Sequence, residues 1–255
     1  MTRALIKPLL AAAALTCAVS SQAAQNDVVR IGIEGAYPPF SSVDSKGNLY
    51  GFDVDIAKAL CNQMKAKCQF VSQEWDGIIP ALIARKFDAI ISSMADTEER
   101  RKQVDFSNAY YHTTIAVAVS KDADIKDISP ESMKGHAIGA QSSSTQGMYA
   151  EDVYGKAGAD VHLYPTPDEA GADLIAGRLD AIVHDKFPLR EWMEKHSEDC
   201  CRMLGEIKET ESPISVAVRK GDKKLAERFN KAIDAIRADG TYQKISIKYF
   251  GTDIY

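Results

Sequence analysis

An eleven-residue segment of this chain occurs twice, and this repetition constrains the fold more than any other feature. Residues 83–93 read Ile-Ala-Arg-Lys-Phe-Asp-Ala-Ile-Ile-Ser-Ser, and residues 175–185 read Ile-Ala-Gly-Arg-Leu-Asp-Ala-Ile-Val-His-Asp. Residues 31–34 and 138–141 form a second, shorter pair, in which a strand-like run ends in a small or polar loop. The repetition predicts two similar α/β lobes.

Short β-rich runs alternate with helical patterns along the whole chain. Leu225, Phe229 and Ile233 recur at helical spacing, Asp53 is expected to cap a helix, and another helix is expected over 77–86. Such alternation is typical of an α/β protein with largely parallel sheets. The runs expected as strands are Val28–Ile33, Gln69–Val71, Asp88–Ser92, Thr114–Val119, Ala137–Ala140, Val161–Tyr164, Ala181–Val183 and Ile214–Val218.

Two of these runs are expected to connect the lobes. Thr114–Val119 and Ile214–Val218 are extended and apolar, and no long Gly/Ser linker lies beside them. We interpret them as crossover strands, and a pair of crossovers makes a hinge. The prediction assigns 24–113 and 214–255 to lobe 1, assigns 114–213 to lobe 2, and places the hinge strands near 114–119 and 212–218.

The N-terminus has the layout of a secretory signal peptide. Arg3 and Lys7 precede an apolar run, and small residues lead to an expected cut near Ala23. The run is too short to span a bilayer comfortably. A lipoprotein anchored at Cys17 would be expected to have leucine where Ala14 stands. Residues 1–23 are therefore expected to be removed, which delivers a soluble protein to an oxidising compartment.

Charge and cysteine content agree with that compartment. The chain has 31 basic and 36 acidic residues, a net charge of −5, so it lacks the basic surplus that nucleic acid requires. Cys61 and Cys68 are seven residues apart, where a helix can pass into a strand, and we expect a disulfide between them. Cys200 and Cys201 can be bonded or reduced. Neither pair has the spacing of a zinc site, and no metal is expected.

Candidate binding residues follow the predicted strands, because open parallel sheets bind ligands at the carboxyl ends of their strands. These segments are Glu34–Tyr37, Ser92–Arg100, Gln141–Gln146 and His184–Asp185. The guanidinium of Arg100 suits a carboxylate, unless the charged run around it is simply a solvated helix face. By type, Glu34 and Asp185 suit cations, and Tyr37 and Trp75 can flank a ligand side chain, although Glu34 can also be a solvated loop acid and Trp75 a core residue.

Motifs of the common enzymes are absent from the sequence. There is no Gly-x-Ser-x-Gly elbow, no His-Glu-x-x-His and no Gly-x-Gly-x-x-Gly. His184 and Asp185 are adjacent, and neighbours on a strand point to opposite faces, so they make a poor acid–base pair. The sequence favours a binding protein without a cofactor over an enzyme.

Several ordered stretches together resemble a known family. They are residues 31–40 (Ile-Gly-Ile-Glu-Gly-Ala-Tyr-Pro-Pro-Phe), 51–57 (Gly-Phe-Asp-Val-Asp-Ile-Ala), 75–82 (Trp-Asp-Gly-Ile-Ile-Pro-Ala-Leu), 88–94 (Asp-Ala-Ile-Ile-Ser-Ser-Met), 176–180 and 237–242. This set resembles the periplasmic solute-binding proteins of polar amino-acid ABC importers, particularly the lysine/arginine/ornithine- and histidine-binding group. The resemblance covers nearly the whole chain after residue 23, and the Cys61–Cys68 pair matches the group's disulfide position.

The resemblance implies a type II periplasmic binding fold, a monomeric two-lobed clamp that delivers one amino acid to a membrane permease and its ATPase. In that reading Arg100 holds the α-carboxylate, Asp185 holds the α-ammonium, and Glu34 faces the distal charge of a cationic ligand, arginine before ornithine, lysine or histidine. The implied ligand-binding set is Glu34, Tyr37, Trp75, Ser92, Ser93, Met94, Arg100, Gln141, Ser144, Thr145, Gln146 and Asp185.

Three positions depart from the family's usual pattern. Ala95 stands where a serine is common, Glu34 is longer than the aspartate of several relatives, and Trp75 is bulkier than the usual leucine or phenylalanine. These differences keep an arginine-derived opine open as the ligand. A periplasmic enzyme similar to the cyclohexadienyl dehydratases is another alternative, because it uses the same fold. A sensing partner that docks on a membrane receptor instead of a permease is a third, because its sequence would look the same.

Overall fold

The computed structural model describes residues 27–196 and 200–255, and the predicted signal peptide with its cut near Ala23 lies outside them. Its elements are β1 (Val28–Ile33), β2 (Ala36–Tyr37), β3 (Ser41–Val43), β4 (Leu49–Tyr50), α1 (Phe52–Gln63), β5 (Lys67–Ser72), the short helix η1 (Trp75–Gly77), α2 (Ile78–Ile83), β6 (Ala89–Ile90), α3 (Glu98–Arg101), β7 (Val104–Ser120), α4 (Pro130–Met133), β8 (Ala137–Gln141), α5 (Thr145–Tyr149), the π-helical turn η2 (Ala150–Gly155), β9 (Asp160–Tyr164), α6 (Pro167–Ile175), β10 (Ala181–Asp185), α7 (Lys186–His196), β11 (Cys201–Arg219), α8 (Lys223–Ala238) and α9 (Thr241–Phe250).

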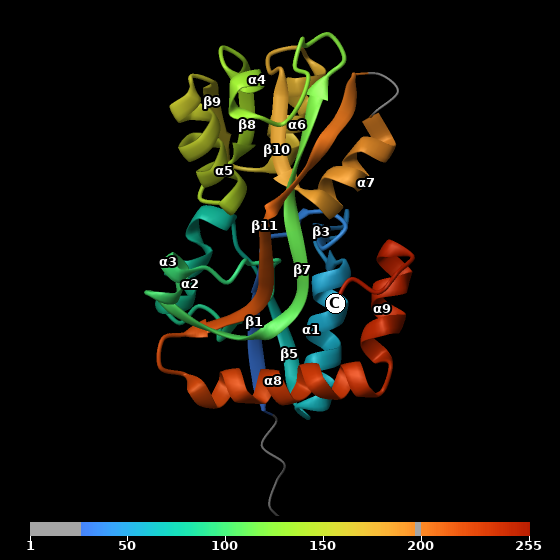
Figure 1. Cartoon of the computed structure of the whole chain (residues 1–255). Coiled ribbons are helices and arrows are strands. Elements are labelled where there is room, and N and C mark those ends of the chain that lie inside the picture. The colour runs from blue at the N-terminus through green and yellow to red at the C-terminus, as the bar shows by residue number, and fades with distance from the viewer. Residues whose placement is uncertain (1–26, 197–199) are drawn as a thin grey trace, which may run out of the picture.

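Two long antiparallel strands, β7 and β11, run through both lobes (Figure 1). They join the lobe sheets into one eight-stranded sheet with the order β5-β1-β6-β11-β7-β10-β8-β9. Within lobe 1, β1 is parallel to β5 and β6, and within lobe 2, β8 is parallel to β9 and β10. The expected α/β architecture with parallel strands is confirmed, and the predicted crossovers are segments of much longer strands.

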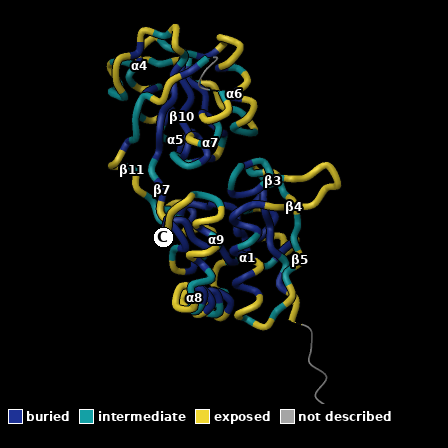
Figure 2. Tube along the Cα trace, turned by 90° about the vertical axis from the view of Figure 1, so that its right-hand side faces the viewer, coloured by how far each residue is buried: buried dark blue, intermediate teal, exposed yellow. Residues whose placement is uncertain are grey.

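Each lobe has its own hydrophobic core, visible as two separate buried interiors in Figure 2. In lobe 1, α1, α8 and α9 pack together beside the sheet, with Phe52, Phe229 and Tyr242 fully buried among them. In lobe 2, Ile138 and Tyr154 are buried against the inner face of β7. Within the described residues, no helix combines the length and apolar character needed to cross a membrane.

The repeated segment has the same structural role in both lobes. The side chain of Asp88 accepts a hydrogen bond from the amide of Arg30 at 3.1 Å, and the amide of Asp88 donates to the carbonyl of Arg30 at 2.8 Å. Asp180 accepts from the amide of Ala137 at 2.9 Å and donates to the Ala137 carbonyl at 2.8 Å. Each aspartate therefore ties the start of its strand to the neighbouring parallel strand.

The core contacts of the repeat also match. A Cβ at Gly32 would lie 2.5 Å from the ring of Phe87, and a Cβ at Gly139 would lie 2.4 Å from Leu179. The paired positions 85 and 177 both have positive φ, 63° at Arg85 and 69° at Gly177. The left-handed residue at 85 ends the predicted 77–86 helix early, so that α2 stops at Ile83.

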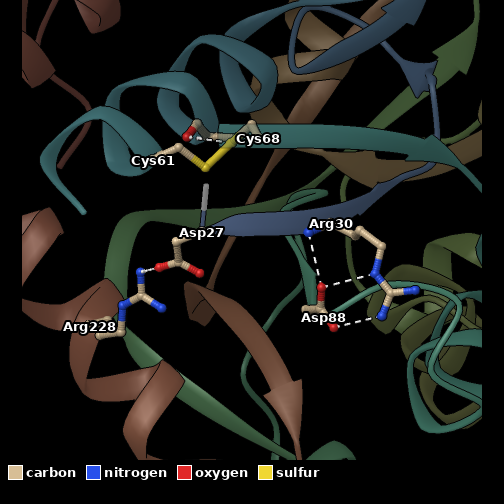
Figure 3. The surroundings of a disulfide bond; sticks show 7 residues. Asp27, Arg30, Cys61, Cys68, Asp88 and Arg228 are labelled. Carbon is tan, nitrogen blue, oxygen red and sulfur yellow. Dashed lines mark hydrogen bonds and ion pairs between the residues drawn. A yellow bond between two sulfur atoms is a disulfide. The ribbon is translucent and has the colours of Figure 1, made fainter. Parts of the chain in front are cut away.

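The expected disulfide is present. Cys61 near the end of α1 is bonded to Cys68 in β5 with a Cα–Cα distance of 5.9 Å (Figure 3). In the same region Asp27, just before β1, pairs with Arg228 of α8. Cys200 and Cys201, left open by the sequence, are bonded to each other.

Removing the Cys61–Cys68 bond is expected to lower stability and to leave ligand affinity nearly unchanged. The bond closes a short loop, and loop-closure entropy gives about 2.5 kcal/mol. It lies far along α1 from the carboxyl ends of the strands. The measurement is the melting temperature and ligand affinity of the Cys61→Ala/Cys68→Ala variant, which keeps the Cys200–Cys201 bond. A large loss of affinity would show that the bond shapes the binding site.

The cap expected at Asp53 is wrong, although the helix is present as α1. Asp53 does not cap it, because Gly51 occupies the N-cap position and no side chain caps the helix there. A Cβ at position 51 would lie 2.3 Å from the carbonyl oxygen of Phe40, and its φ is 128°, so only glycine suits the turn. The carboxylate of Asp53 is instead buried inside lobe 1.

Candidate functional site

A small cavity lies between the lobes, at the carboxyl ends of β1 and β6 on one side and of β8 and β10 on the other. It is lined by Glu34, Tyr37, Trp75, Ser92, Ser93, Ala95, Arg100, Gln141, Ser144, Thr145, Gln146 and Asp185. All but one of the predicted site residues line this cavity together. The location of these residues after the carboxyl ends of parallel strands was therefore enough to predict the cavity lining.

Met94 is the exception. Its side chain is 1% exposed and packs in the lobe 1 core with Ile78, Leu82 and Phe87, and it is not among the lining residues. The next residue, Ala95, takes its place in the lining, and its carbonyl accepts from Arg100. The signal that points to Ala95 is its position in the segment between the strand end and Arg100.

Arg100 supplies the positive charge of the cavity. It lies in α3, whose N-cap Thr97 accepts from the amide of Arg100 at 3.2 Å. Its Nη1 donates to the carbonyl of Ala95 at 2.9 Å, and its guanidinium lies 5.2 Å from the centre of the Trp75 ring. Burial lowers the pKa of Arg100 to about 10, so the side chain stays a cation at neutral pH.

Asp185, at the end of β10, supplies the first of two buried carboxylates. Its Oδ2 accepts from the hydroxyl of Tyr37 in lobe 1 at 2.5 Å. Burial raises the pKa of Asp185 to about 6, and hydrogen bonds from Tyr37 and Gln146 and the charge of Arg100 partly oppose that rise. The carboxylate is thus ionised near neutral pH, and the two side chains that donate hydrogen bonds to it are neutral and leave its negative charge unbalanced.

Glu34, just after β1, supplies the second carboxylate. Its amide donates to Ser92 Oγ at 3.0 Å, and its Oε1 accepts from Gln141 Nε2 of lobe 2 at 2.6 Å. Burial raises the pKa of Glu34 to about 7, the Gln141 bond opposes this, and the charges of Asp76 and Asp168 add to it. The negative charges around Glu34 make this end of the cavity attractive to a cation.

The lobes are closed on each other around the cavity. Besides the Tyr37–Asp185 and Glu34–Gln141 bonds, Ser142 Oγ of lobe 2 donates to the carboxylate of Asp76 at 2.9 Å. The guanidinium of Arg100 donates across the interface to the carbonyl of Ser143 at 3.3 Å. The lobe 2 wall continues into α5, where Ser144 Oγ accepts from the amide of Gly147 at 2.9 Å.

The charges of the cavity are complementary to those of a particular kind of molecule. One buried guanidinium and two buried carboxylates match a ligand with one carboxylate and two cationic groups. The carboxylates belong to different lobes, so such a ligand bridges the interface. Among residues 27–196 and 200–255, no group of three or more His, Cys, Asp or Glu side chains is arranged to hold a metal ion.

The model of the bacterial extracellular solute-binding proteins, family 3, matches residues 29–252. The chain belongs to this family. The chain is 44% identical to the L-arginine-binding protein of Pseudomonas aeruginosa over 252 residues, covering 97% of each chain. It is 37% identical to the lysine/arginine/ornithine-binding periplasmic protein of Escherichia coli, covering 94% of each.

A solved structure agrees with these sequence matches. An ancestral arginine-binding protein bound to arginine superposes with a TM-score of 0.83 and is 39% identical, covering 88% of this chain and 98% of that one. The two-lobed type II architecture expected from the sequence resemblance is confirmed. These relatives are named as binding proteins rather than enzymes.

Proposed function

We propose that this family 3 protein is a periplasmic receptor for a cationic L-amino acid, arginine before ornithine, lysine or histidine. The observation that carries the proposal is the placement of Arg100, Asp185 and Glu34 in one closed cavity. The α-carboxylate pairs with Arg100, the α-ammonium with Asp185, and the side-chain cation with Glu34. Tyr37 and Trp75 line the aliphatic part. The names of the similar proteins support arginine as the first ligand to test.

The proposed mechanism is conformational rather than catalytic. A ligand that contacts both lobes binds the closed state more tightly than the open state and shifts the population toward closure. We place the bending in β7 and β11 near 114–119 and 212–218, which leaves 24–113 with 214–255 and 114–213 as the moving lobes. The register of β11 on β7 is irregular between Ile207 and Ser212 and again between Ile214 and Ser215, which supports this location.

The closed receptor then delivers its ligand to the permease of an ABC importer, driven by an ATPase, and acts as a monomer without a cofactor or nucleic acid. Export by the signal peptide with a cut near Ala23 belongs to the same proposal, and the periplasmic relatives support it. Neutralising three ligand charges in a closed cavity should give at least micromolar affinity, about −8 kcal/mol.

Calorimetric titration of the mature protein tests this function. The protein is unfolded and refolded to remove bound ligand, then titrated with arginine, ornithine, lysine, histidine, glutamine and glutamate. Binding confined to the cationic ligands is expected. Silence toward all six would overturn the ligand class, and arginine-derived opines would be titrated next, with turnover of prephenate and arogenate measured for a dehydratase.

The affinity for arginine is expected to fall as the pH falls below about 7. Glu34 has a pKa of about 7 in the free protein, so at lower pH a proton occupies the carboxylate that the guanidinium needs. From pH 8 to pH 5 the ionised fraction falls by about 100-fold, and arginine affinity falls with it. Citrulline, which has the same shape without the charge, should lose only the roughly tenfold that both ligands lose as Asp185, with a pKa of about 6, takes up a proton. Equal pH profiles for both ligands would contradict the role of Glu34.

A further inference from the structure

Asp53 carries a fully buried carboxylate that lies next to the cavity without lining it. Its Oδ1 accepts from the hydroxyl of Tyr110 at 2.8 Å, and its Oδ2 accepts from the hydroxyl of Ser93 at 2.8 Å. In the described part of the chain it forms no ion pair. Burial raises its pKa to about 7, and the two hydroxyls oppose that rise. A buried carboxylate without a counter-cation is costly for a fold, so its partners indicate what it does.

Its partner Ser93 has an unusual backbone. Its φ is 51°, in the left-handed region that residues with a Cβ seldom adopt. The amide of Ser93 donates to the hydroxyl oxygen of Tyr110 at 3.2 Å, and its side chain donates to Asp53. Three hydrogen bonds among Asp53, Tyr110 and Ser93 therefore hold this conformation. The amide and hydroxyl of Ser93 are both used inside lobe 1.

The backbone carbonyl of Ser93 is the one polar group of this residue that is not hydrogen-bonded within the described structure. Ser93 lines the cavity, and within the described residues its carbonyl oxygen has no hydrogen-bond partner. Lobe 2 shows what such a residue does at this cavity, because Ser143 has a φ of 52° and its carbonyl accepts from the guanidinium of Arg100. A left-handed serine on that side thus offers its carbonyl to a cation.

We propose that Asp53 is a positioning residue for the amino-acid site, holding Ser93 in the left-handed conformation so that the Ser93 carbonyl receives the ligand's α-ammonium. The role rests on the proposed function, since it assumes an amino-acid ligand. It acts on a group that every amino acid carries. Loss of Asp53 should therefore weaken all ligands by the same factor, whereas loss of Glu34 affects only the cationic side chain.

A double-mutant cycle tests this role, because glycine adopts positive φ without strain. Arginine and citrulline are titrated into the wild type and into the Asp53→Asn, Ser93→Gly and combined variants. Asp55→Asn is the matched control, because Asp55 lies in the same first turn of α1 and binds Lys248 and Tyr249 instead.

Asp53→Asn is expected to weaken both ligands by about tenfold. Ser93→Gly sets its own reference affinity in the cycle, and adding Asp53→Asn to it should cost nothing further. Unchanged affinity in Asp53→Asn, or a tenfold loss in the glycine background as well, would overturn the proposal. If Asp53→Asn does not fold, Tyr110→Phe replaces it in the cycle, since that variant removes two of the three hydrogen bonds and keeps the ring.

A crystal structure of Asp53→Asn without ligand provides the arm that does not depend on binding. Ser93 is expected to leave the left-handed region in this variant, and a φ that stays near 51° would overturn the proposal even if affinity changes. If the wild type binds no amino acid, the function fails while this structure still decides whether Asp53 controls Ser93. The two failures are thus distinguishable.

Discussion

Arg100→Ala is expected to abolish the binding of every amino acid, with a loss of affinity of about a thousandfold or more. Arg100 is 6% exposed, its guanidinium donates to the Ala95 and Ser143 carbonyls, and none of the other lining residues is a cation. Truncating one member of a buried charge pair costs about 2–5 kcal/mol, and here the ligand carboxylate would be left unpaired opposite two protein carboxylates.

The measurement is calorimetric titration with arginine, lysine and glutamine. Arg101→Ala is the matched control, because Arg101 is the next residue of the same helix, is exposed, and pairs with Asp96 without lining the cavity. Its affinity should equal that of the wild type. Arg100→Lys should recover only part of the affinity, because an ammonium cannot form two parallel bonds to a carboxylate. If Arg100→Ala still binds amino acids, the ligand α-carboxylate does not pair with Arg100.

Glu34→Gln is expected to weaken arginine by about a hundredfold and to leave citrulline nearly unchanged. The substitution keeps the size of the side chain and removes the charge of the lining carboxylate that accepts from Gln141. An unpaired guanidinium in a buried site loses a charge-assisted hydrogen bond of about 2–3 kcal/mol. Citrulline has no such charge to lose.

Titration of both ligands into both proteins gives the difference directly. Glu74→Gln serves as the control, because Glu74 lies at the start of η1, carries the same charge and does not line the cavity. The Glu34→Gln variant should also lose the steep fall of arginine affinity below pH 7. An equal loss for arginine and citrulline would mean that Glu34 shapes the cavity without recognising side-chain charge.

Much of the fold was predictable because local patterns and the internal repetition agree. All eight expected strands lie in or overlap the sheet, since alternating α and β segments with few-residue loops leave little choice of architecture. The short strands β2, β3 and β4 were missed, because two- or three-residue strands carry no periodicity. The length of β7 was missed as well, since its lobe 1 half has no simple pattern of burial.

The site was predictable for a topological reason, and its details were not. Strand ends identified Glu34, Arg100 and Asp185 as neighbours although they are far apart in sequence. Met94 was predicted to bind ligand because it follows a strand end, but its side chain packs into the core, and position after a strand does not tell which way a side chain points. Asp53 was misread because an acid near a helix start usually caps it, and only the tertiary contact with Ser93 and Tyr110 reveals its burial.

The path of β7 and β11 between the lobes also sets the order in which the chain can fold. The lobe 2 core is built from residues between Ile115 and Ile207, all contiguous in the chain. The lobe 1 core needs Phe229, Ile233 and Tyr242 from the last two helices. When the chain is made or exported N-terminus first, the lobe 2 core can therefore form before the lobe 1 core is complete. The first strands of lobe 1 then wait for the last two helices before they can be buried.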